Sequence, residues 1–282
     1  MFFALRRLGR RELSEYQHNR VQSRGAHAAP QGQGPVRPVS VSQGRRKPKR
    51  SGGVWRVVFI ISLIMFVCAA GALAFIGYGY WHGQQNNKQL EQIGFNAPDA
   101  AALQRMDLAS FTVDWDALRA INPDVMGWIY VPGTTVNFPI VHGTDDEHYL
   151  KTDFYGQTSW VSFGSIFLSA ANAADFSDAN NIVYGHHMND GSMFSPFADF
   201  GDVDTFNGHR IVYVFTPTAN YQLTTFSIVH CAADDPLAQT AFASEQERQA
   251  YVQDKVDRSV VTVASLPSAA DMEHTFAFST CD

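Results

Sequence analysis

The longest apolar run in the chain covers residues 57–81, which include no Asp, Glu, Lys or Arg. A helix of this length reaches roughly 37 Å, more than the hydrocarbon core of about 30 Å that it would have to cross. Aromatic residues lie at both ends of the run, as is common at membrane interfaces: Trp55, Tyr78, Tyr80 and Trp81. The pattern predicts a single transmembrane helix over residues 54–81.

After this run the pattern changes to short β-branched or aromatic stretches separated by Gly, Pro, Asn and Ser. Two helices interrupt it, a short one at 114–118 that ends before Pro123, and a longer one that begins at Ser244 with Glu247 in a capping box. The pattern predicts a mainly β domain, an antiparallel barrel or sandwich with helical insertions. The expected strands lie at 127–132, 136–141, 165–168, 181–184, 210–216, 221–230 and 275–280.

Charge divides the chain at the apolar run. Residues 1–56 hold 13 Lys and Arg against two Glu, and residues 57–282 hold 8 against 25 Asp and Glu. Basic residues just before the run put the N-terminus in the cytoplasm and the later residues outside the cell. A cleaved signal peptide is disfavoured because the run starts late, is too long and has no clear cleavage site.

Four segments follow from these patterns. Residues 1–53 have almost no apolar periodicity, which predicts a disordered basic cytoplasmic tail attracted to anionic headgroups. Nucleic-acid binding is the weaker reading of such a tail, and we expect no nucleic-acid partner. Residues 54–81 form the anchor, 82–113 a stalk or N-terminal helical segment, and 114–282 the compact domain.

Two residues of the compact domain suggest chemistry. His186 lies where an apolar strand enters a loop bounded by Gly185 and Gly191, and Cys281 follows the alternating strand 275–280. A thiol with an ordinary pKa of about 8.5 needs a nearby base at neutral pH, and His186 could supply it. Cys231 is expected to be a buried thiol because it lies within an apolar strand. A bridge from Cys231 to Cys281 is the alternative, and it would remove the nucleophile.

No metal or cofactor is expected. His186, Cys281 and a further histidine lack the spacing of metal ligands, and residues 145–147 are read as a solvated acidic loop. His187 is interpreted as a hydrogen-bonding or exposed neighbour of His186.

Several stretches together resemble a known family. The segment 122–129, the strand 137–141 and the segment 164–168 are similar, in order, to the class B sortases, which are Gram-positive cell-surface cysteine transpeptidases. The segment 181–194 resembles the family's histidine-bearing region, and residues 278–282, Phe-Ser-Thr-Cys-Asp, resemble its Leu-Ser-Thr-Cys strand. The match covers residues 115–282.

The resemblance implies a distorted antiparallel β-barrel with Cys281 as nucleophile and His186 as general acid and base. Ser279 and Thr280 would contact substrate. The implied reaction cleaves a sorting signal of the Asn-Pro-x-Thr kind through a thioacyl enzyme and transfers the product to a cell-wall precursor or pilin amine. The implied location is the cell membrane, with a single pass and the catalytic domain outside.

Three departures leave an alternative open. Ala277 and Phe278 replace a Thr and a Leu of the commoner motif. The family also places an oxyanion-stabilising arginine on a strand after the cysteine, whereas this sequence ends at Asp282, and Arg210, Arg248 and Arg258 match no catalytic position. The chain is therefore expected to be truncated and to lack its C-terminal strand, with an inactive membrane-anchored surface module as the alternative. Other cysteine hydrolases are disfavoured because their Cys precedes their His.

Overall fold

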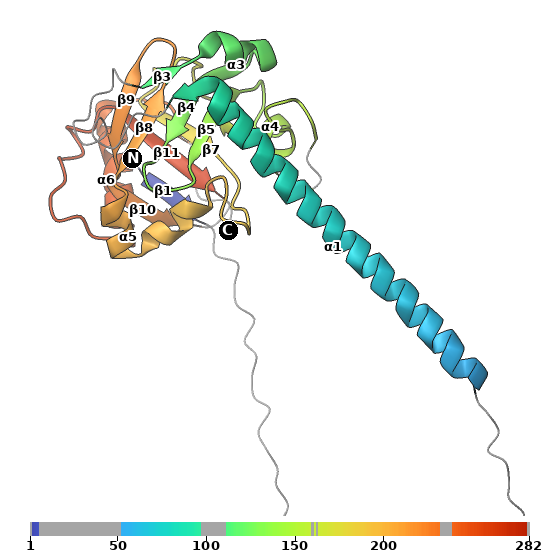
Figure 1. Cartoon of the computed structure of the whole chain (residues 1–282). Helices are drawn as coiled ribbons and strands as arrows, with labels where there is room; N and C mark the ends of the chain where they lie inside the picture. The colour runs from blue at the N-terminus through green and yellow to red at the C-terminus, as the bar shows by residue number, and fades with distance from the viewer. Residues whose placement is uncertain are drawn as a thin grey trace, which may run out of the picture. The chain divides into compact units, whose positions relative to one another are not determined.

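The computed structural model describes residues 2–5, 52–96, 111–158, 161, 163–231 and 239–280 (Figure 1). All structural statements below concern these residues. The chain divides into two compact units, one made of Met1–Leu8 with Ala72–Asp282 and the other of Gly9–Gly71. The barrel, the candidate site and residues 72–94 of the long helix belong to the first unit.

The long helix α1 covers Gly52–Gly94 (Figure 1). Within the described residues it is the single helix long and apolar enough to cross a membrane, by length and composition only. The helix continues through residues that were expected to form a stalk, and Leu90 in this continuation is only 1% exposed. Residues 82–94 therefore belong to the packed domain, while 97–110 of the expected stalk lie outside the described residues.

A nine-stranded sheet forms the body of the domain, in the order β10-β1-β11-β7-β6-β5-β4-β8-β9. The pairings β5–β6, β7–β11, β1–β10 and β1–β11 are parallel and the other four are antiparallel. The predicted fold class, a mainly β sortase-like barrel with helical insertions, is confirmed, with a mixed sheet in place of an antiparallel one. The strands are β1 (Phe2–Leu5), β4 (Val125–Tyr130), β5 (Asn137–His142), β6 (Ile166–Leu168), β7 (Asn180–Tyr184), β8 (Ile211–Phe215), β9 (Asn220–Thr224), β10 (Ser227–His230) and β11 (Thr275–Thr280).

Helices and a small ribbon surround this sheet. The predicted short helix is α3 (Trp115–Ile121), whose N-cap Asp114 accepts a hydrogen bond from the backbone N–H of Ala117. Half of the predicted capping box is present, since the Ser244 hydroxyl accepts from Glu247 N at the start of α6 (Glu245–Asp257). The Glu247 carboxylate accepts from Ala243 N in place of Ser244 N. The remaining elements are β2 (Phe95–Asn96), β3 (Thr112–Val113), α4 (His148–Lys151), η2 (Ser195–Gly201) and α5 (Val203–Gly208).

Strand β1 comes from the start of the chain and lies between β10 and β11. Its four residues pair in parallel with both neighbours, so that Leu5 is opposite His230 on one side and Thr280 on the other. The predicted disordered tail thus contains a four-residue strand, and the rest of it, except Gly52 and Gly53, lies outside the described residues.

Two clusters of buried side chains form the core. The larger one fills the barrel, and the smaller one packs Leu90 of α1 and Leu118 of α3 against Trp128 and Phe215 on the outer face of the sheet. Phe95 stacks on Trp128 with ring centroids 5.2 Å apart. The end of α1 is therefore held to the sheet by a buried aromatic layer.

Candidate active site

His186 follows the end of β7, where the sheet delivers it beside β11. The parallel register places Tyr184 opposite Ser279, and Gly185 N donates a hydrogen bond of 3.0 Å to Ser279 O. Two residues after Tyr184 comes His186, and two residues after Ser279 comes Cys281. Because neighbouring parallel strands end at the same sheet edge, β7 and β11 lead to one end of the barrel.

The His186 ring is held by a backbone carbonyl of α4. Its Nε2 lies 2.6 Å from Leu150 O. A carbonyl oxygen only accepts hydrogen bonds, so this contact requires the hydrogen on Nε2 and leaves Nδ1 available as the base in the neutral ring. When the ring is doubly protonated, both nitrogens donate, and the Leu150 contact is kept in either state.

Helix α4 carries this carbonyl and is held in place by Tyr149, the residue before Leu150. The Tyr149 hydroxyl donates to Asp124 Oδ2 at 2.7 Å, and Tyr149 O accepts from Ser165 N at 2.9 Å. Burial, followed by the hydrogen bond to Asp124, raises the pKa of Tyr149 to about 12. The phenol therefore stays a donor through the neutral range, which keeps α4 and Leu150 O in place.

Gly164 is the point where three parts of this arrangement meet. A Cβ at this position would lie 2.6 Å from Tyr149 O, 2.8 Å from Leu150 O and 3.1 Å from His186 Cδ2. The two approaches to backbone oxygens are closer than real Cβ contacts, and the approach to the His186 ring is tighter than most. The absence of a side chain at residue 164 therefore lets the Leu150 carbonyl approach the His186 ring.

The loop after His186 is closed on itself. Phe194 N donates to His186 O at 2.9 Å, while Ser195 Oγ accepts from Met188 N and donates to carbonyls of the same loop. Asp190 accepts a 2.8 Å hydrogen bond from Gln84 of α1. His187 lines an open hollow of about 460 Å³ on this loop.

The strand β11 holds two of the predicted site residues, Ser279 and Thr280, and leads to the third, Cys281. Cys281 and Asp282 lie outside the described residues. Ser279 is half-buried, and Thr280 is 6% exposed with a buried hydroxyl that has no partner within the described chain. Phe278, which stands where the family has Leu, packs against Phe194 and Phe197 with ring centroids 5.9 and 5.7 Å apart.

Two arginines of the described chain, Arg210 and Arg248, bind backbone carbonyls. Arg210 donates to Thr225 O, and Arg248 donates to the carbonyls of Met272 and Ala270. Both side chains thus stabilise other segments. No cluster of three or more His, Cys, Asp or Glu within the described residues is placed to hold a metal ion.

Comparison with known proteins gives consistent results. No family model matches the chain. Sortase B of Listeria monocytogenes is 28% identical over 218 residues, covering 75% of this chain and 86% of that protein. Sortase B of Staphylococcus aureus is 31% identical over 147 residues, covering 52% of this chain and 59% of the relative.

Solved structures of similar proteins share the fold of this chain. A Bacillus anthracis protein similar to sortase B superposes with a TM-score of 0.62 at 27% identity, covering 72% of this chain and 92% of that one. The Staphylococcus aureus sortase B–substrate complex gives 0.56 at 26% identity, covering 66% and 82%. The barrel and these relatives define a cysteine transpeptidase. The chain is similar in sequence and in fold to the class B sortases, transpeptidases of the kind that anchor proteins to the cell wall.

Proposed function

We propose that this sortase cleaves a sorting signal of the Asn-Pro-x-Thr kind with the thiol of Cys281 and transfers the acyl product to an amine. The observation that carries the proposal is the parallel register of β7 and β11. It brings the strand that leads to Cys281 beside the strand that leads to His186. A solved relative was determined as a sortase B–substrate complex, which supports peptide recognition by this fold.

The proposed reaction steps follow from the hydrogen bond between His186 Nε2–H and Leu150 O, which leaves Nδ1 for proton transfer. The Cys281 thiol gives its proton to His186 Nδ1, and its sulfur attacks the carbonyl carbon of the Thr in the signal. The C–N bond then breaks as His186 Nδ1–H protonates the leaving amine. The neutral Nδ1 then takes a proton from the incoming amine, which displaces the thiol. Each transfer uses Nδ1, because Nε2 remains bonded to Leu150 throughout.

Thr280 supplies a further contact in this proposal. Its hydroxyl is buried next to the nucleophile and lacks a hydrogen-bond partner in the described part of the chain. An unpaired buried hydroxyl is costly, so a substrate group that bonds to it gains affinity. We assign Thr280 and the half-buried Ser279 to substrate binding.

The membrane placement is part of the same proposal. Helix α1 anchors the enzyme, its basic flank keeps the N-terminus in the cytoplasm, and the barrel meets sorting signals on the outer surface. The accepting amine belongs to a cell-wall precursor or to a pilin.

Cleavage of a fluorogenic Asn-Pro-x-Thr peptide by the purified full chain tests the function. Cys281→Ala should abolish cleavage, and His186→Gln should lower kcat by about 100- to 10,000-fold, the usual value of general acid–base catalysis. Cys231→Ala and His230→Gln serve as matched controls that keep the wild-type rate. Full activity in either of the first two variants would exclude the mechanism.

A further inference from the structure

A cavity of about 340 Å³ lies between the end of α1 and the barrel. The volume falls within the range of about 300–1,000 Å³ that is usual for small-molecule sites. Its wall on the helix runs from Phe75 to Leu90, and the facing wall includes Phe138, Phe163 and Ile166. Both walls belong to the same compact unit.

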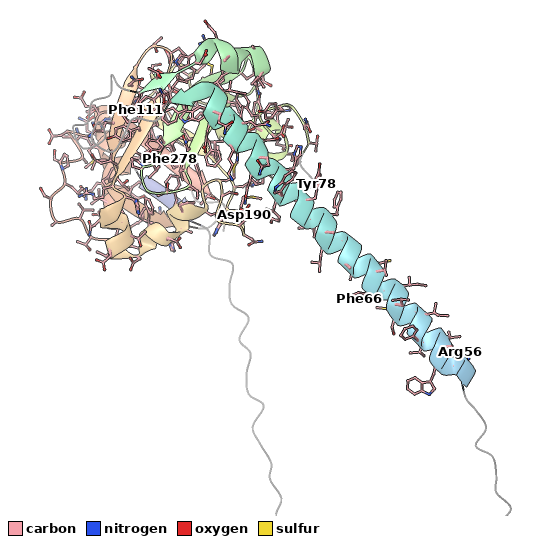
Figure 2. The ribbon with its side chains drawn as sticks, in the orientation of Figure 1. Arg56, Phe66, Tyr78, Phe111, Asp190 and Phe278 are labelled. Atoms are coloured by element: carbon pink, nitrogen blue, oxygen red, sulfur yellow. The ribbon has the colours of Figure 1, made fainter. Side chains whose placement is uncertain are left out.

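The lower end of this cavity coincides with the end of the predicted membrane span. Phe75 and Tyr78 line it, both are 60% exposed, and both fall within residues 57–81. Figure 2 labels Tyr78 on the stretch of α1 that runs beside the domain. An occupant of this end would therefore meet the hydrocarbon edge of a bilayer.

Two glycines bring the barrel down to that level. A Cβ at Gly79 would lie 2.9 Å from Val161 Cγ1, and one at Gly83 would lie 2.7 Å from Phe163 Cγ. Gly79 precedes the interfacial residue Trp81, so Val161 lies at the height of the last turn of the span. Val161, in the loop before β6, thus packs against the last turn of the predicted span.

The upper end of the cavity is polar and carries one carboxylate. Asp153 accepts from Asn86 Nδ2 at 3.3 Å, and Asn87, Gln157 and Thr158 line the wall beside it. Among the described lining residues there is no Lys or Arg. Tyr155 also lines this end, and its buried hydroxyl has no hydrogen-bond partner in the described part of the chain.

We propose that this cavity is a lipid site that takes the zwitterionic, ammonium-bearing headgroup of a phospholipid from the leaflet on the domain's side. The ammonium lies near the Asp153 carboxylate and the face of Tyr155, which both attract cations. The neutral amides and the Thr158 hydroxyl donate to the phosphate. A headgroup with net negative charge is repelled by Asp153. The proposal rests on α1 crossing the membrane.

Lipid retention tests this site. The full chain is extracted into detergent with equal amounts of phosphatidylethanolamine and phosphatidylglycerol, and bound lipid is counted by native mass spectrometry. We expect one phosphatidylethanolamine per chain and about a five- to tenfold preference over phosphatidylglycerol, as an interaction of about 1 kcal/mol or slightly more gives. Equal retention of the two lipids, or none, would overturn the assignment.

Two variants and a control define the position. Asn87→Phe fills the cavity without removing an observed hydrogen bond and should abolish retention. Asp153→Asn keeps the shape and should reduce the preference to less than about twofold. Asp204→Asn, on exposed α5, should change nothing. Unfolding midpoints verify that all three fold, and unchanged retention in Asn87→Phe would contradict the site. The lipid experiment contains no sorting peptide, so its result does not depend on whether the transpeptidase proposal is correct.

Discussion

At the scale of single residues, the position of His186 depends on groups that perform no chemistry. Leu150 O binds its Nε2, Gly164 leaves room for that contact, and Tyr149 fastens the short helix α4 to Asp124. A misplacement of about 1 Å in such a support can reduce catalysis 100-fold. These neighbours should therefore affect turnover more than substrate affinity.

Substitution of Gly164 tests the support directly. In Gly164→Ala the new methyl group pushes against two backbone carbonyls and the His186 ring, so kcat should fall about 10- to 100-fold with KM nearly unchanged. Steady-state peptide cleavage measures both constants. Gly208→Ala, where a Cβ meets open space, is the control. A rise in KM alone would mean that Gly164 contacts substrate.

Tyr149 should affect stability with a distinct pH dependence. Its pKa is about 12 in the fold against an ordinary 10, so the folded protein holds this proton more tightly. The resulting stability is complete below pH 10 and is lost as the pH rises towards 12. Tyr149→Phe should lower the unfolding free energy by about 1–2 kcal/mol at pH 8. Above pH 10 the unfolding free energy of the variant should fall less steeply with pH than that of the wild type. Denaturant titrations at pH 8 and above pH 10 measure the unfolding free energies. An equal pH dependence of the wild type and the variant would contradict this role of Tyr149.

Sequence patterns single out His186 and Cys281 as the proposed catalytic residues, but they did not predict the groups that hold His186. His186 has a strand before it and glycines around it, which is a local signal. Tyr149, Asp124 and Gly164 come together only in the folded chain, since their contacts join α4, the start of β4 and the segment before β6. A role for them could not be derived from spacing alone.

At the scale of elements, strand positions followed from hydrophobic alternation, but strand pairings did not. The predicted run 221–230 is two strands, β9 and β10, separated at Thr225 and Phe226. Alternation shows which face of a strand is buried and says nothing of its neighbour's direction, so the four parallel pairings were not foreseen. The span-length helix was correctly located, and its packed continuation to Gly94 was not.

The helix α6 should depend on its buried arginine. Arg248 is 5% exposed, pairs with Glu245, and donates to carbonyls of the segment that leads into β11. Arg248→Met should lower the unfolding free energy by about 1–3 kcal/mol, because those carbonyls lose a charged donor. Arg258→Met, in a more exposed pair with Asp254, should cost at most about 0.5 kcal/mol. Chemical denaturation distinguishes the two, and similar losses would contradict this role of Arg248.

At the scale of the whole molecule, β1 and a membrane-spanning α1 exclude each other in one chain. Strand β1 precedes α1 and lies in the sheet that follows α1. Residues 6–51 are rich in Arg and contain no second apolar run long enough to return across a bilayer. In the anchored protein, β1 must leave the place between β10 and β11.

Labelling in oriented vesicles tests this exclusion. With native cysteines replaced by Ala, the thiol introduced by Ala4→Cys should react with an impermeant maleimide only after permeabilisation. The thiol introduced by Asp116→Cys, on exposed α3, should react before it. Reaction of both thiols before permeabilisation would place the N-terminus with the barrel. Protection of the Ala4→Cys thiol under both conditions would mean that β1 stays in the sheet.

The central claim is that a thioacyl enzyme forms on the residue to which β11 leads. The most direct measurement is intact mass and peptide mapping of the full chain after brief exposure to an Asn-Pro-x-Thr peptide. We predict one adduct of the acyl fragment, located on Cys281, released by hydroxylamine and missing in Cys281→Ala. An adduct on Cys231, or peptide cleavage that continues without any adduct in Cys281→Ala, would contradict the account.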